Sequence, residues 1–284
     1  MKKLLLLLLL ATTAAAQSRV DVEINQVNDR RSKGFFSRLT IALDLPKVRS
    51  TDVVASRVLV TSATDDSGQS LLDSEAQEPQ LELNSGAMFV KNPEAKPVTV
   101  SLVLKNPDRK AKTVKEVTGE IELFMPSKDP NSIAEIAKFL SLSGKPLSHK
   151  ALKANGVEIA MLSPAQVDVE RKRLGEAKKK EWKDSGWSGQ DLDNMVASFL
   201  ESLLRVEENE VVLRVKDPSK HIQEIVYVDA SGEVKRASMR TDEGLTMLTT
   251  WGDKPQPDWK LRVSMKTPKN LVRHTFALND VALP

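Results

Sequence analysis

The chain contains no cysteine and few of the other residues on which many active sites depend. Without thiols, it has no disulfide bonds, no thiol nucleophile and no cysteine-ligated metal centre. Only three histidines occur, His149, His221 and His274, and no two of them have the spacing of a helical metal-binding pair. The 12 glycines form no phosphate-binding loop, and no G-x-S-x-G nucleophile motif is present. We therefore predict no catalytic residue, no cofactor and no metal site.

Long apolar runs are missing except at the N-terminus. Two lysines precede the run Leu4–Leu10, and Ala14–Ala16 supplies an A-x-A cleavage site. This is the pattern of a secretory signal peptide, and the run is far shorter than the roughly 20 residues of a transmembrane helix. We expect residues 1–16 to be removed after Ala16. The mature protein is then periplasmic or secreted, with no stable membrane insertion after signal removal.

A strong excess of either charge is also missing. The full sequence has 42 Lys+Arg against 39 Asp+Glu, and loss of the two signal lysines leaves 40 against 39. A nearly neutral mature chain has no global field that attracts nucleic acid. The partners that we expect are another envelope protein or a glycan, and no nucleic acid.

What is present is alternation of apolar and polar residues with a period of two. Such alternation is typical of antiparallel strands with one buried face. Turn residues such as Asp66-Ser67-Gly68 and Asn106-Pro107-Asp108 separate the strands. The positions predicted to face the core include Leu39, Ile41, Leu43, Leu45, Val54, Val58, Val60, Val98, Val100, Leu102, Leu104, Ile121, Leu123 and Met125. We predict an immunoglobulin-like β-sandwich domain over residues 17–127.

Residues 128–284 combine strands with one strongly helical stretch. Residues 132–140 fit a helix face and a strand equally well. A long polar helix from Pro164 and a second, amphipathic helix after Ser188 predict an α-helical hairpin at about 164–205. At the end of the chain, two strands with a turn at 267–270 predict a closing hairpin, with Trp259, Leu261, Val263 and Met265 facing the core opposite Val272, His274, Phe276 and Leu278. The predicted fold class is mainly β: two immunoglobulin-like antiparallel β-sandwich domains, the second over 128–284 with the helical hairpin inserted.

The helical hairpin has two faces of interest. Its second helix places apolar residues on one stripe that must be buried: Leu192, Met195, Val196, Phe199, Leu203 and Leu204. Its first helix is rich in lysine and arginine, and this basic strip fits either an anionic surface or a solvated face with pairs such as Glu176 with Lys180.

The four tryptophans all lie in the second half of the chain. Trp259 alternates with Leu261 and is predicted to lie in the core. Trp187 lies between the two predicted helices, and Trp251 lies beside a proline-rich loop. Exposed tryptophans serve as protein hot spots or as platforms for sugars. We predict Trp187 and Trp251 as partner or ligand contacts.

The stretch ATDDSGQSLLDSE carries two adjacent carboxylates, Asp65 and Asp66. Carboxylates and carbonyls suit calcium, but the spaced acidic series of a calcium loop is missing. Asp and Gly are also the residues that a tight turn requires, and VDASGE contains the same turn with a single Asp. We interpret the stretch as a turn and leave calcium binding as the alternative.

Two patches carry a family resemblance. VTSATDDSGQSLL and the ending KLRVSMKTPKNLVRHTFALNDVALP, which closes on Asp280, Val281, Leu283 and Pro284, resemble an uncharacterised family of exported bacterial β-sandwich proteins of unknown function. His274-Thr275-Phe276 departs from the more apolar approach expected before the last phenylalanine. The resemblance covers two short segments. It implies export and a β-sandwich, and it implies no chemistry.

The function predicted from these observations is that of an exported bacterial envelope protein that serves as a non-catalytic binding or scaffolding module. A carbohydrate-binding module that uses exposed tryptophans is the second hypothesis. A hydrolase whose site assembles from distant loops is the third.

Overall fold

The chain is mainly β and divides into two compact units. The computed structural model describes residues 18–32, 37–73, 79–83, 96–204 and 209–284. Unit 1 comprises Met1–Met125 together with Leu271–Pro284, and unit 2 comprises Pro126–Asn270. The predicted signal peptide lies outside the described residues. In the part of the chain that is described, no helix has both the length and the apolar character needed to cross a bilayer.

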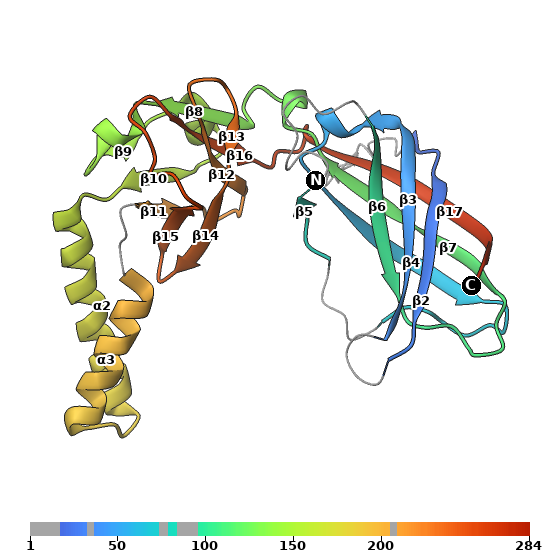
Figure 1. Cartoon of the computed structure of the whole chain (residues 1–284), viewed down its shortest axis with the longest axis horizontal. Coiled ribbons are helices and arrows are strands. Elements are labelled where there is room, and N and C mark those ends of the chain that lie inside the picture. The colour runs from blue at the N-terminus through green and yellow to red at the C-terminus, as the bar shows by residue number, and fades with distance from the viewer. Residues whose placement is uncertain (1–17, 33–36, 74–78, 84–95, 205–208) are drawn as a thin grey trace, which may run out of the picture. The chain divides into compact units, whose positions relative to one another are not determined.

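Unit 1 consists of two sheets that share one core. The first sheet has the strand order β1-β17-β7-β4-β5, and the second has the order β2-β3-β6. Figure 1 shows the two sheets facing each other. The strands are β1 (Ser18–Arg19), β2 (Glu23–Arg30), β3 (Arg38–Arg49), β4 (Ala55–Asp65), β5 (Glu82–Leu83), β6 (Pro97–Leu104), β7 (Thr113–Phe124) and β17 (Leu271–Ala282), with a short 3₁₀ turn, η1 (Ser50–Asp52), after β3.

The core of unit 1 is built by the alternation that the sequence shows. β3 and β6 each bury every second residue, from Leu39 to Leu45 and from Val98 to Leu104. Across the core, β4 and β7 contribute Val58, Ile121 and Leu123. Each large side chain removed from water contributes about 1.5–3 kcal/mol. The predicted core positions of β3 and β6 are confirmed, as are Val58, Ile121 and Leu123, while Val60 and Met125 are partly buried against the core. Val54 was predicted wrongly: it precedes β4, and its neighbour Val53 is the buried residue.

Unit 2 contains two further sheets, with the orders β14-β15-β11-β10-β9 and β13-β12-β16-β8. Its elements are η3 (Pro126–Lys128), β8 (Ile133–Ala137), η4 (Phe139–Leu142), β9 (Pro146–Leu147), α1 (Lys150–Ala154), β10 (Glu158–Met161), α2 (Pro164–Asp184), α3 (Gly189–Leu204), β11 (Glu210–Lys216), β12 (Ile222–Val228), β13 (Val234–Lys235), β14 (Ala237–Asp242), β15 (Leu245–Thr250) and β16 (Lys260–Met265). Residues 132–140, which the sequence left ambiguous, form strand β8 and the 3₁₀ turn η4.

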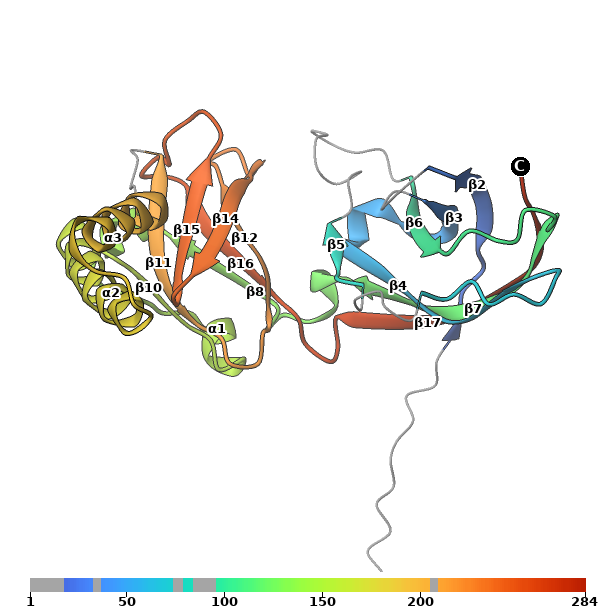
Figure 2. The same cartoon turned by 90° about the horizontal axis from the view of Figure 1, so that it is seen from below.

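The five-stranded sheet of unit 2 is covered on both faces. Val211 and Leu213 of β11 face the core shared with the other sheet, which also contains Trp259. Val212, between them, faces the opposite side with Leu245 and Met247 of β15 and with side chains of α2. Figure 2 shows α2 and α3 beside β10 and β11 on this side. The alternation of Val211, Leu213 and Val215 in the sequence fits the first face of β11 and gives no sign of the second.

Helices α2 and α3 pack along each other. α2 begins where predicted, because the Ser163 side chain and Gln166 form a reciprocal capping box ahead of Pro164. The ring of Phe199 on α3 meets Trp182 edge to face at 5.8 Å, and Lys179 Nζ contacts Asp193 Oδ1 at 2.6 Å. The described part of the α3 stripe is buried to half-buried. Nothing is described for the side chains of Leu203 and Leu204.

The predicted closing hairpin is wrong. β16 pairs with β12 and β8 in unit 2, whereas β17 pairs with β7 and β1 in unit 1. Alternation shows which residues of a strand face a core, but it does not show which strand lies alongside. The units therefore differ from the predicted ranges 17–127 and 128–284, since Leu271–Pro284 belongs with the first unit.

Candidate functional site

A polar pocket of about 550 Å³ opens at one corner of unit 2. Three side chains form a row across neighbouring strands, because Thr249 of β15 pairs with Ser238 of β14 and with Glu210 of β11. Arg240 follows two residues later on the same face of β14. The last turns of α3 form the other wall. We call this feature the corner pocket, and its lining residues are Ser198, Glu201, Ser202, Glu210, Ser238, Arg240 and Thr249.

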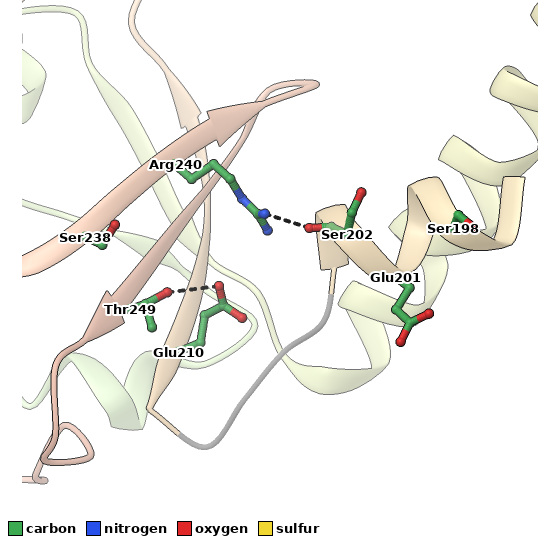
Figure 3. Close-up of a pocket in the computed structure, with 7 residues that line it drawn as sticks. All are labelled: Ser198, Glu201, Ser202, Glu210, Ser238, Arg240 and Thr249. Carbon is green, nitrogen blue, oxygen red and sulfur yellow. Dashed lines mark hydrogen bonds between the residues drawn. The ribbon is translucent and has the colours of Figure 1, made fainter. Parts of the chain in front are cut away.

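Hydrogen bonds hold the two walls of the corner pocket in place. Arg240 Nη1 donates to the backbone carbonyl of Ser202 at 2.6 Å, near the C-terminus of α3, where a cation is favoured. Thr249 Oγ1 donates to Glu210 Oε1 at 3.2 Å. Figure 3 shows Arg240 directed toward the helix, and Glu201 directed away from Arg240. The floor of the pocket is a sheet, so the positions of its side chains are set by the strand register.

Trp251 begins the loop that leaves β15 beside this corner. It follows Thr249 by two residues and is 86% exposed. The base of its loop is fixed, because Thr250 N donates to the Asn209 carbonyl at 3.1 Å and Thr250 Oγ1 donates to the Asp253 carbonyl at 2.6 Å. The large apolar side chain is thus displayed to solvent from an ordered position.

Trp187 is exposed as well, but at the other end of α3. It lies in the turn between α2 and α3, where 47% of its surface is exposed. The 16 residues of α3 span about 24 Å between this turn and the end of the helix that lines the pocket. The two tryptophans therefore do not form one platform.

The three histidines are placed at separate points. His149 Nδ1 accepts from Ala151 N and caps α1 at 3.1 Å, and His221 Nδ1 lies 2.9 Å from the Lys266 carbonyl. His274 lies on β17 in unit 1. None of them lines the corner pocket. Across the described residues, no group of three or more His, Asp or Glu side chains could hold a metal ion.

Asp65 forms a turn from its own carboxylate. Its Oδ1 accepts from Ser67 N, Ser67 Oγ and Gln69 N at 2.7–3.0 Å, and its Oδ2 accepts from Asp108 N at 2.8 Å. Burial raises the pKa of this carboxyl, and the hydrogen bonds outweigh it and lower the pKa below its ordinary value. Protein donors therefore occupy both oxygens of the buried Asp65 carboxylate.

The turn at Asp229 repeats this arrangement. Asp229 Oδ1 accepts from Ser231 N, Ser231 Oγ and Glu233 N at 2.7–2.9 Å. The glycines that follow, Gly68 and Gly232, both adopt a positive φ, 85° and 83°. The two Asp-x-Ser-Gly stretches thus share one turn geometry, as the interpretation of ATDDSGQSLLDSE as a turn requires.

No protein family model matches the chain, and the comparisons with curated proteins and with solved structures gave no match either. The corner pocket was not predicted, because its residues come from α3, β11, β14 and β15 and have no common spacing. The closest signal in the sequence was Trp251, which lies two residues after a lining residue.

Proposed function

We propose that the protein is a non-catalytic binding module of the bacterial envelope, exported by its N-terminal signal and built from two immunoglobulin-like β-sandwiches, the second carrying the helical hairpin. The observation that carries the proposal is the junction of an exposed tryptophan with a polar pocket at one corner of unit 2. The described lining consists of hydroxyl, carboxylate and guanidinium groups, which can hold a polar ligand by hydrogen bonds.

The proposed contact surface is the corner pocket together with Trp251. The Trp251 side chain is bulky and 86% exposed. Because it is mostly apolar, its transfer out of water costs little free energy, and it offers a large contact area to a partner. The hydrogen bonds of Thr250 order the base of the loop beforehand, which lowers the entropy cost of association. Both a protein partner and a glycan fit a polar pocket beside an exposed tryptophan.

Export and binding can be tested on the full chain. Expressed with its own N-terminus in a Gram-negative host, the protein should be recovered from the periplasm or medium with the mass of a chain that starts at Gln17. Recovery of the uncleaved chain from the cytoplasm would contradict export.

The purified mature protein should then be immobilised and exposed separately to peptidoglycan, lipopolysaccharide and soluble envelope proteins. We expect one of these fractions to be retained by the wild type and by Trp187→Ala, and released by Trp251→Ala. Equal retention by the Trp251 variant, or no retention of any fraction, would refute the proposed surface.

A further inference from the structure

The described residues that line the corner pocket all carry polar side chains. Of the seven described lining residues, four carry hydroxyls, two carry carboxylates and one carries a guanidinium group. Hydroxyls both donate and accept hydrogen bonds, carboxylates accept them, and the guanidinium donates them. A ligand that displaces water from such walls has to offer donors and acceptors in return, because unpaired polar groups are costly. An apolar ligand does not meet this requirement.

The charges of the described lining residues limit the classes of ligand further. Among the described lining residues, the two carboxylates of Glu201 and Glu210 outnumber the single cation, Arg240. Arg240 is also engaged with the carbonyl of Ser202 at the end of α3. Anion-binding sites usually present several cations or unpaired backbone amides. The corner pocket therefore favours a neutral or cationic ligand over a phosphorylated or carboxylated one.

Trp251 adds an apolar surface next to this polar pocket. Because two residues span no more than about 7 Å of chain, its Cα lies within that distance of the Cα of Thr249, on the pocket wall. Its face is free for stacking on an apolar ring face, since 86% of the residue is exposed. The site thus combines a flat apolar surface with a row of hydroxyl and carboxylate groups.

A saccharide matches both parts of this combination, since a pyranose ring has an apolar face of C–H groups and an edge of hydroxyls. The volume of about 550 Å³ lies within the range of small-molecule sites, about 300–1,000 Å³. We propose that the corner pocket and Trp251 bind a neutral or amine-bearing oligosaccharide, with one ring stacked on Trp251 and the hydroxyls of a neighbouring ring bonded to Glu210, Ser238 and Thr249. This inference rests on the proposed binding function and names its ligand class.

The test uses the mature full-length protein and three soluble probes: the tetramers of N-acetylglucosamine, glucosamine and galacturonic acid, which are neutral, cationic and anionic. Tryptophan fluorescence and isothermal titration calorimetry measure binding. We expect the neutral or the cationic tetramer to bind at least tenfold more tightly than the anionic one. Binding of the galacturonic acid tetramer alone, or equally tightly, would overturn the inference.

Variants locate the binding. Trp251→Ala should weaken binding about tenfold, whereas Trp187→Ala should leave it within about twofold. Glu210→Gln, which keeps an acceptor for Thr249, should weaken the glucosamine tetramer more than the neutral one. An unchanged affinity in Trp251→Ala would refute the site. If no tetramer binds at millimolar concentration while an envelope fraction is still retained through Trp251, the ligand class is wrong and the binding function stands. Loss of both would refute both.

Discussion

At the scale of single residues, Glu122 shows how unit 1 holds a charge inside its sheet. Its carboxylate is fully buried on β7, between Arg57 of β4 and Arg273 of β17, which are its cross-strand partners. The two arginine Nε atoms lie 2.5 and 2.6 Å from its oxygens. Burial raises the pKa of Glu122, but the hydrogen bonds and charges of both arginines outweigh it and lower the pKa below 4.5.

We predict that Glu122→Gln destabilises the protein by about 3 kcal/mol at neutral pH, because two arginines lose their shared counter-ion. Since the folded pKa is lowered, the stabilisation by Glu122 is complete above the ordinary value of 4.5. It is lost as the pH falls from there through the folded value. Urea unfolding at pH 7 and pH 3.5 measures this, and the difference between wild type and variant should shrink at the lower pH.

The matched control is Glu116→Gln, on the same strand with an exposed side chain. It should change the unfolding free energy by less than about 0.5 kcal/mol at either pH. An equal loss in the two variants would show that the arginine pair does not stabilise the sheet.

The two Asp-x-Ser-Gly turns allow a second comparison between single residues. In Asp65→Asn, one of the two carboxylate oxygens is replaced by an amide NH₂ group, which cannot accept a hydrogen bond. If the NH₂ group replaces Oδ2, the bond from Asp108 N is lost, and if it replaces Oδ1, the bonds from Ser67 and Gln69 are lost. In Asp229→Asn, the side-chain oxygen keeps all three hydrogen bonds that Oδ1 accepts. We expect Asp65→Asn to cost about 1–3 kcal/mol and Asp229→Asn less than about 1 kcal/mol, by chemical denaturation. Equal losses would contradict this account.

At the scale of elements, Gly119 fixes how closely β7 packs against its neighbours. A Cβ at this position would lie 2.3 Å from the Leu59 carbonyl oxygen and 2.9 Å from the ring of Phe276. β4 has a register shift opposite this residue, between Val60 and Ser62. A glycine inside a strand marks such a bulge or close backbone approach.

We therefore predict that Gly119→Ala costs about 3 kcal/mol or more, because a backbone atom has to move. Gly175→Ala is the control, since its Cβ would meet the end of the flexible Leu200 side chain at 3.1 Å and Val196 at an ordinary 3.8 Å. There the gain in helix propensity, about 1 kcal/mol, offsets the contact. Thermal unfolding of both variants measures the difference, and a Gly119→Ala protein as stable as the wild type would show that β4 adjusts freely.

The elements also show what the sequence can and cannot predict. The inward positions of β3, β6 and β11 follow from local alternation, and the start of α2 follows from Ser163 and Pro164, because these signals lie within a few residues. The pairing of β17 with β7 does not follow from the sequence, since the alternation of β17 would fit a sheet of either unit. The corner pocket also depends on which strands pair and in what register. Glu210, Ser238 and Thr249 are far apart in the sequence and become neighbours only through the pairing of β11, β15 and β14. Of the proposed contact surface, the sequence singles out Trp251 alone, through its residue type.

At the scale of the whole molecule, the chain leaves unit 1 after Met125 and returns to it at Leu271. The returning strand β17 lies between β1 and β7 and supplies Phe276, Leu278 and Val281 to the core. Unit 2 is the stretch of sequence between these two points, and both of its apolar clusters are formed from its own residues. Folding of unit 1 thus depends on the last residues of the chain, and folding of unit 2 does not.

This arrangement predicts how fragments behave. Residues 126–270 alone should unfold cooperatively on heating. Residues 17–125 alone should stay unfolded, because β7 keeps β4 but loses β17, which also supplies core residues. Phe124 and Leu271 are cross-strand partners, so a two-residue Asn-Gly turn can join Phe124 to Leu271 and should restore a folded unit 1. Circular dichroism melts and amide dispersion in NMR spectra distinguish these outcomes. A cooperative melt for residues 17–125, or none for residues 126–270, would show that the two units depend on each other in another way.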